Sequence, residues 1–474
     1  MRKRDSLLRN IDWIPILIYI CLITFGWINI FSAEFNEEHR SIFDLSQRYG
    51  KQMIWILAAL VMAFVVFLID VKFFSLFAYV LYGIVLFSLI LVLVVGKEIH
   101  GARSWFEIGS FHLQPSEFTK IVTALALAKY MSTFHFRINK FKPVMVVGLL
   151  IIAPALLIAI QPDLGSAIVF VSFVFIIYRE GFSGIMIFIG ILFTGLFFLT
   201  LIVDQVYILV GMILASWLIF WILHRKARQV ILSFLVLVVV SSLLWALNYF
   251  TAVDMSYYLI LVVGLLVSLP FYLFYAIRRK VRYIFVIAGF LISAVLFTFS
   301  VDYVFHSVLE EHQQQRVNIL LGIESDPLGI GYNVNQSKIA IGSGGFSGKG
   351  FLNGTQTKFD FVPEQSTDFI FCTIGEEWGF IGTSLVIIMF VILLLRLIWM
   401  AERQRSAFSR IYGYGVVAVL FTHFVINIGM TIGLLPVIGI PLPFFSYGGS
   451  SLWAFTLLLF IFIRLDASRK ELLG

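Results

Sequence analysis

A succession of long apolar runs constrains the fold of this 474-residue chain more than any other feature. Most runs are about 15–24 residues long, which suits helices that cross roughly 30 Å of hydrocarbon and is too long for the strands of a membrane barrel. Hydrophobic residues make up 60% of the chain and charged residues 13%. Because so little polar surface cannot cover a water-soluble globule of this size, we expect an all-α polytopic membrane protein.

The runs predict about fourteen transmembrane helices within a single integral membrane domain, residues 1–474. Between these apolar runs the chain has one long hydrophilic segment, residues 302–379. The predicted spans are 13–33, 52–69, 74–96, 117–132, 143–160, 165–178, 184–203, 206–223, 229–248, 256–276, 283–301, 380–400, 411–434 and 449–464.

The basic residues predict the orientation of the chain, because Lys and Arg near span ends are retained on the cytoplasmic side. The segment 2–9 before the first span is basic, and counting fourteen spans puts every other strongly basic short loop on that same side. Both termini are therefore expected in the cytoplasm. The net charge of +7 then indicates loops facing an anionic membrane surface, not a nucleic-acid patch.

The same count places 97–116, 161–164, 302–379 and 435–448 on the outer face. The third of these is rich in Phe, and a loop of that length is usually functional. We expect it to form a folded extracytoplasmic cap with short helices and tight glycine turns. The Pro-rich stretch 436–451 should line the same outer cavity, since non-helical backbone at that depth is tolerated only where protein or water surrounds it.

Asp326 lies in "SDPLGIGY", where Asp-Pro and the following glycines predict a fixed turn. A carboxylate held on such a turn near a membrane surface would lose part of its solvation, which raises its pKa toward the useful range of a general base. The alternative for this and the other acids of the segment is a solvated loop charge.

Charges at the edges of spans carry further information, because an unpaired ion in hydrocarbon is costly. Glu117 and Lys120 share a helix face and can pair, either as a structural ion pair or as a polar site in which the lysine neutralises a diphosphate. Asp163 in "QPDLGSA" is favoured as a helix cap over a catalytic role. Trp105 in "GARSW" is either an interfacial residue or a surface on which a sugar ring stacks.

The glycine-rich "GSGGFSGKG", residues 342–350, is not a phosphate loop, because Ser343 and Gly350 occupy positions that the Walker motif reserves for Gly and Ser/Thr. We expect these glycines to let the chain bend near a bulky substrate, with Lys349 meeting an anion. Glu376 and Glu377 in "GEEWG" should face water or polar partners within the cap. No metal-binding spacing of Cys or His occurs.

Long motifs of the chain together resemble the RodA/FtsW (SEDS) family of bacterial cell-wall polymerases, and "NGTQTKF" and "SDPLGIGY" are closer to RodA than to the division member. The motifs occur in the family's order and cover most of 97–180 and 303–464. They are "GARSWFEIGSFHLQPSEFTK", "QPDLGSA", "QQQRVNILLGIESDPLGIGYNVNQSKIAIGSGGFSGKGFLNGTQ", "FVPEQSTDFIF", "GEEWG" and "NIGMTIGLLPVIGIPLPFFSYGGSS".

The resemblance implies a peptidoglycan glycosyltransferase of the bacterial cytoplasmic (inner) membrane that polymerises lipid II into β-1,4 glycan strands during cell elongation and shape maintenance. It also implies a class B penicillin-binding transpeptidase as partner, with lipid II and the undecaprenyl-linked glycan as substrates. By resemblance, Asp326 is the essential carboxylate, Trp105 the functionally sensitive tryptophan, and Glu117 and Lys120 the polar pair of the fourth helix.

Positive groups should stabilise the departing diphosphate. The candidates, in falling order, are Lys120, Lys338, Lys349 and Arg316, and Ser337 and Asp163 complete the candidate substrate-binding set. A divalent cation, Mg²⁺ or Mn²⁺, could assist, although no ligand cluster in the sequence demands one.

The family usually has ten spans, so about four additional helices are expected between 184 and 301.

Two alternative functions, from classes other than enzymes, remain open. A transporter that flips the lipid-linked precursor would need polar groups toward both faces, whereas the sequence gathers them outside. A structural scaffold would not need a charged pair inside a helix.

Overall fold

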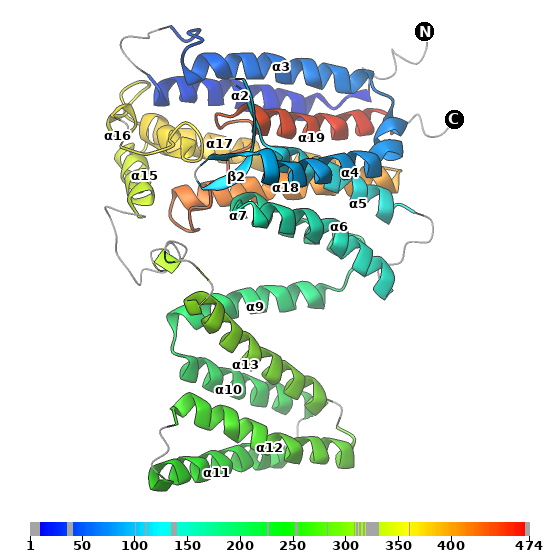
Figure 1. Cartoon of the computed structure of the whole chain (residues 1–474), viewed down its shortest axis with the longest axis vertical. Helices are drawn as coiled ribbons and strands as arrows, with labels where there is room; N and C mark the ends of the chain where they lie inside the picture. The colour runs from blue at the N-terminus through cyan, green and yellow to red at the C-terminus, as the bar shows by residue number, and fades with distance from the viewer. Residues whose placement is uncertain are drawn as a thin grey trace. The chain divides into compact units, whose positions relative to one another are not determined.

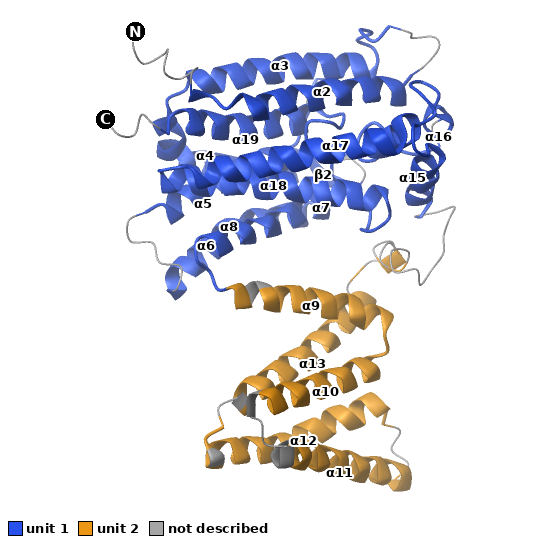
Figure 2. Ribbon diagram, turned by 180° about the vertical axis from the view of Figure 1, so that it is seen from behind, with its two compact units in different colours: residues 1–183, 325–474 blue, residues 184–324 orange. Residues whose placement is uncertain are grey.

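The computed structural model describes residues 10–35, 41–99, 101–109, 111–133, 140–224, 227–251, 255–281, 283–307, 309, 311, 314–315, 318, 331–359 and 361–469. The chain divides into two compact units, unit 1 (1–183 and 325–474) and unit 2 (184–324), which Figure 2 colours separately. The region predicted to contain the additional helices, 184–301, falls within unit 2.

Unit 1 is a bundle of long helices that run side by side (Figure 1). Its helices are α2 (Trp13–Ala33), α3 (Arg48–Leu68), α4 (Val71–Val95), α5 (Pro115–Met131), α6 (Phe141–Ile160), α7 (Leu164–Ile168), η1 (Val169–Phe173), α8 (Val174–Arg179), α15 (Tyr332–Ser343), α16 (Thr355–Lys358), α17 (Ile370–Glu402), α18 (Ala407–Thr431) and α19 (Gly449–Ala467).

Unit 2 consists of a second set of apolar helices. Its helices are α9 (Gly184–Ile202), α10 (Gln205–His224), α11 (Ala227–Thr251), α12 (Tyr257–Arg279) and α13 (Tyr283–Ser307). Within the unit, α12 packs against α10, α11 and α13, and α10 also packs against α13.

Across the described residues, eleven helices are long and apolar enough to cross a membrane, and each corresponds to a predicted span. The all-α, multi-pass architecture is therefore confirmed, whereas the count of fourteen stays a prediction. The three other expected spans are helical but shorter or more polar. They are α5, which has 17 residues and carries Glu117, Lys120 and Lys129, Leu164–Arg179, which η1 interrupts, and α9, whose described apolar part is Phe188–Ile202.

A small antiparallel sheet occupies the stretch 97–116, which we expected only as an outer loop. Its strands are β1 (Lys97–Ile99), β2 (Ala102–Ile108) and β3 (Phe111–Leu113), in the order β1-β2-β3. Gly101 and Gly109 join the strands with φ angles of 80° and 64°, values that favour glycine.

Helix α5 is enclosed within unit 1, because α4, α6, α18 and α19 all pack against it. Pro115 occupies its first turn, where the missing amide proton costs nothing. The side chains of Glu117 and Lys120 are consequently buried among helices, although both are charged.

The polar motifs meet at one end of unit 1 through close backbone contacts. Gly165 lies directly against the loop 432–448, because a Cβ added at this residue would stand 2.1 Å from the carbonyl oxygen of Ile438. The Gln114 side chain donates to Asp163 (2.9 Å), and Ser450 Oγ donates to the carbonyl of His112 (2.8 Å). The motif "QPDLGSA", the start of α5 and the loop 432–448 are thus neighbours, as expected.

Candidate active site

The centre of the site is the ion pair between Glu117 and Lys120, one turn apart on α5. The Lys120 ammonium lies 2.7 Å from the Glu117 carboxylate, and the two side chains are only 2% and 3% exposed. The predicted pairing is therefore present. Since desolvating two charges is expensive, a pair this deeply buried needs further hydrogen bonds.

His423 of α18 supplies one of those bonds. Its Nε2 lies 3.0 Å from Lys120 Nζ, and its Nδ1 lies 3.2 Å from the carbonyl oxygen of Pro441. A carbonyl can only accept, so Nδ1 carries the proton and the lone pair of Nε2 accepts from the ammonium. The Phe455 ring packs 4.8 Å from Lys120 Nζ, which adds a cation–π contact.

Sequence reasoning missed His423, because 303 residues separate it from Lys120. The available signal was a titratable side chain inside the apolar span 411–434, a position where such residues are rare and often functional. The contact with Pro441 also connects the Glu117–Lys120–His423 cluster to the loop 432–448.

Asp163 is a helix cap, as favoured from the sequence, because its carboxylate accepts from the Ser166 amide at 3.0 Å. Asp368 is a second carboxylate at the end of unit 1 where the polar motifs meet, and its side chain is half-buried. Burial, together with the neighbouring Glu364 and Asp163 carboxylates, raises the pKa of Asp368 to about 7. The Asn427 side chain donates to the backbone carbonyl of Asp368 at 2.8 Å and thereby fixes this segment to α18.

Lys349 meets an anion, but the anion is a carboxylate of the protein. Its ammonium lies 2.6 Å from Glu376, whose fully buried side chain also accepts from the backbone amides of Thr355, Gln356 and Thr357. The expectation that Glu376 has polar partners within the cap is confirmed. The pair stabilises the cap from within.

The glycine-rich segment bends against α17 instead of lying open for a bulky substrate. Gly348 has a φ angle of 79°, and an added Cβ there would stand 2.1 Å from the carbonyl oxygen of Glu377. Glu377 itself accepts from Ser32 and from the Leu352 amide. Packing against α17 thus explains Gly348.

Ser337 and Lys338 are adjacent on α15 but have different surroundings. Ser337 is buried and donates to the carbonyl of Thr431 at 2.8 Å. Lys338 is exposed, lies beside Gly433, and makes no ion pair with the described residues. Of the predicted cations of the cap, Lys338 is therefore better placed than Lys349 to meet an external anion.

Trp105 lies on β2, half-buried, with its ring 6.5 Å from that of His112. On the same hairpin the ammonium of Lys97 lies 2.8 Å from Glu107 and lowers the pKa of that carboxyl.

Asp326 and Arg316 lie outside the described residues. In the part of the chain that is described, no group of three or more His, Cys, Asp or Glu side chains could hold a metal ion.

These observations define a polytopic membrane protein with a buried, hydrogen-bonded charge cluster beneath a folded cap. The sequence profile of the family described as "Cell cycle protein", covering FtsW, RodA and SpoVE, matches residues 12–218 and 206–471. The chain therefore belongs to the FtsW/RodA/SpoVE family, as the motifs predicted.

Curated relatives align over nearly the whole chain. The peptidoglycan glycosyltransferase RodA of Treponema pallidum is 32% identical and covers 94% of each chain. The peptidoglycan glycosyltransferase MrdB of Escherichia coli is 29% identical, covering 94% of this chain and 90% of MrdB. Stage V sporulation protein E of Bacillus subtilis is 29% identical and covers 97% of each.

Solved structures share the fold. A chain from a study of a peptidoglycan synthase complex that coordinates polymerization and crosslinking aligns with a TM-score of 0.62 at 24% identity, covering 97% of this chain and 99% of its own. The rod shape determining protein RodA of Thermus thermophilus aligns with a TM-score of 0.55 at 22% identity, covering 97% and 98%.

Proposed function

We propose that this chain is a peptidoglycan glycosyltransferase that polymerises lipid II at the outer face of the cytoplasmic membrane during cell elongation and shape maintenance. Relatives named as peptidoglycan glycosyltransferases support the activity. The observation that carries the proposal is the buried Glu117–Lys120–His423 cluster, a costly arrangement that a scaffold would not need.

The reaction joins two lipid-linked sugars. The 4-hydroxyl of the acceptor GlcNAc attacks the anomeric carbon of the MurNAc at the end of the growing chain, and the bond to undecaprenyl diphosphate breaks. The α-linked diphosphate becomes a β-1,4 bond by one inverting displacement. A single general base suffices for such a step, and we assign the hydroxyl proton to the carboxylate of Asp326.

Cationic groups stabilise the leaving diphosphate in this account. Lys120 is the first candidate, because Glu117 and His423 hold its ammonium in one place. Lys338 is the second, because it is exposed at the cap and makes no ion pair with the described residues. A divalent cation, Mg²⁺ or Mn²⁺, could share this charge.

The partner in this proposal is a class B penicillin-binding transpeptidase, which would crosslink the strands. One structural neighbour comes from a peptidoglycan synthase complex that coordinates polymerization and crosslinking, and this association supports such a pairing. The proposed orientation has both termini in the cytoplasm and the cap outside.

The test is reconstitution of the purified chain in vesicles with fluorescent lipid II, with and without the partner and with Mg²⁺, Mn²⁺ or a chelator. We expect glycan strands that a muramidase digests and that form from lipid II supplied outside. Transfer of intact lipid II between leaflets without polymer would instead support the transporter.

A further inference from the structure

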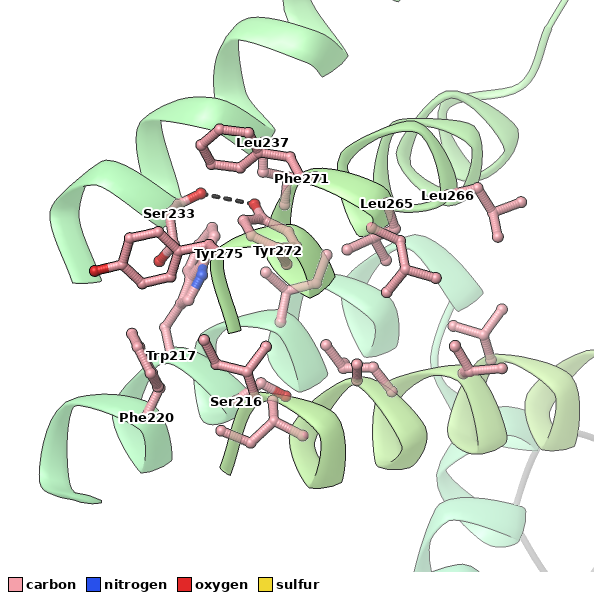
Figure 3. Close-up of a pocket in the computed structure, with 18 of the residues that line it drawn as sticks. Ser216, Trp217, Phe220, Ser233, Leu237, Leu265, Leu266, Phe271, Tyr272 and Tyr275 are labelled. Atoms are coloured by element: carbon pink, nitrogen blue, oxygen red, sulfur yellow. Dashed lines mark hydrogen bonds between the residues drawn. The ribbon is translucent and has the colours of Figure 1, made fainter. Parts of the chain in front are cut away.

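Unit 2 contains a cavity of about 280 Å³ between α10, α11, α12 and α13 (Figure 3). This volume is just below the range of about 300–1,000 Å³ that is typical of ligand pockets in proteins. The walls are aromatic and aliphatic, and they include Trp217, Phe220, Leu237, Leu265, Tyr272 and Ala288.

Two of the polar side chains in these walls are bonded to backbone carbonyls. Tyr272 Oη donates to the carbonyl of Ser233 at 2.7 Å, a bond drawn in Figure 3, and Ser216 Oγ donates to the carbonyl of Met212 at 2.7 Å. Tyr275 lies one turn before the end of α12. The cavity therefore suits a hydrocarbon chain and not a polar metabolite.

The cavity is also elongated. Its lining extends from Val262 to Tyr275 on α12 and from Ile284 to Leu296 on α13, which at 1.5 Å per residue is about 18–20 Å. One leaflet of the hydrocarbon core is roughly 15 Å deep. A single lipid acyl chain would accordingly fit along it.

Basic residues occur at the end of α12, about one turn after the cavity-lining residue Tyr275. The segments 224–230 and 276–283 contain no acidic residue, and of their basic residues Arg278 and Lys280 are described and exposed. Retention of basic loops in the cytoplasm explains the charges but does not explain an open cavity near Arg278 and Lys280 at the end of α12. The basic residues are Arg225, Lys226, Arg228, Arg278, Arg279, Lys280 and Arg282.

We propose that unit 2 binds an anionic phospholipid of the cytoplasmic leaflet, with an acyl chain in the cavity and the headgroup phosphate against Arg278 and Lys280. Basic pockets between membrane helices on this side suit acidic headgroups. The proposal is independent of the polymerase activity, because none of these residues belongs to the candidate active site.

The test uses Trp217, which lines the cavity and whose fluorescence a brominated acyl chain would quench on contact. The full chain in neutral detergent micelles is titrated with dibromo-phosphatidylglycerol or dibromo-phosphatidylcholine, and Trp217→Phe identifies the signal of Trp217. We expect phosphatidylglycerol to quench at about tenfold lower mole fraction, and Arg278→Gln with Lys280→Gln to remove most of that preference.

Matched variants separate the site from general effects. Ala288→Phe fills the cavity and should abolish the quenching, whereas Val286→Phe, 72% exposed on the same helix and outside the lining, should not. Lys140→Gln with Lys142→Gln removes two exposed charges from unit 1 and should leave the preference intact.

Equal quenching by the two lipids, or unchanged quenching in Ala288→Phe, would overturn the proposal. So would displacement of the brominated lipid by undecaprenyl phosphate at a lower mole fraction than by unlabelled phosphatidylglycerol, because the site would then bind a polyprenyl carrier. If Ala288→Phe fails to elute as folded protein, the charge variants decide, since they leave the cavity unchanged.

Discussion

At the scale of single residues, the Glu117–Lys120–His423 cluster dominates the account. A buried ion pair contributes little net stability, but removing one partner leaves an uncompensated charge. The presence of the Glu117–Lys120 pair in α5 therefore indicates a functional requirement. Stability and activity should respond differently when the members of the cluster are changed.

Lys120→Met should destabilise the protein by about 3–5 kcal/mol, because the Glu117 carboxylate stays buried without its partner. The double variant with Glu117→Gln should recover most of that loss, since the remaining side chains are neutral. Polymerisation should be absent from both variants. Thermal unfolding and lipid II assays on the same preparations check this, and recovery of activity together with stability would contradict a role in the reaction.

His423→Leu should cost about 1.5–3 kcal/mol, the value of a hydrogen bond to a charged group, and lower kcat more than it raises KM. His423→Gln keeps an acceptor for Lys120 and should retain more of both. If the two variants lose activity equally, the bond between His423 and Lys120 is not what positions the ammonium.

Asp368 should make stability depend on pH. Its pKa in the folded protein is raised to about 7, above that of the unfolded chain, so its protonated form stabilises the fold. This contribution is complete below about pH 4 and is lost as the pH rises toward 7. Asp368→Asn should therefore gain stability relative to the wild type between pH 5 and 8 in thermal unfolding. Glu364→Gln removes a neighbouring negative charge and should shift the pH at which this stability is lost to a lower value. A stability difference between Asp368→Asn and the wild type that does not change with pH would refute the prediction.

At the scale of elements, the site depends on three segments that are far apart in the sequence and meet at one end of unit 1. The loop 432–448 is the common neighbour, since it contacts His423 through Pro441 and α7 through Gly165. The geometry of this loop should therefore control the position of His423 in the cluster.

Gly165→Val should clash with the Ile438 carbonyl and cost about 1–3 kcal/mol, with a larger loss of kcat than a surface change of similar cost. The control is Gly148→Ala in α6, where an added Cβ meets nothing within 4 Å and helix propensity should improve by about 1 kcal/mol. Thermal unfolding and polymerisation rates of both variants test this pair. Normal activity of Gly165→Val would show that the loop position does not matter.

The long helices were predictable because hydropathy alone determines them, whereas polar buried segments were not. Helix α17 is kinked at Gly379, whose φ angle is 63°, so its second part begins where the span 380–400 was predicted. The first part, from Ile370, was missed because it contains Glu376, which looks like a loop residue until Lys349 and three amides surround it. Strands β1 and β3 have only three residues each, and the seven residues of β2 do not alternate between polar and apolar, so no periodic signal marks the sheet. Pairing of Glu117 with Lys120 followed from their spacing, but the His423 contact depends on helix packing across the bundle.

For the whole molecule, the proposed function requires the cap to lie outside the cytoplasmic membrane, as the basic loops predict. In a background of Cys21→Ser and Cys372→Ser, Lys338→Cys should react with a membrane-impermeant maleimide added to intact cells. Arg405→Cys, exposed on a predicted cytoplasmic loop, should react only after lysis. The opposite pattern would place the cap in the cytoplasm and exclude an outer polymerase.

The central claim is that the carboxylate of Asp326 accepts the proton of the attacking hydroxyl. The most direct test is the initial rate of lipid II polymerisation by Asp326→Asn beside Glu324→Gln, which removes the same charge two residues away. The account predicts that Asp326→Asn loses at least 10²-fold, the typical contribution of a general base, while Glu324→Gln stays near the wild-type rate. Wild-type polymerisation by Asp326→Asn would contradict it.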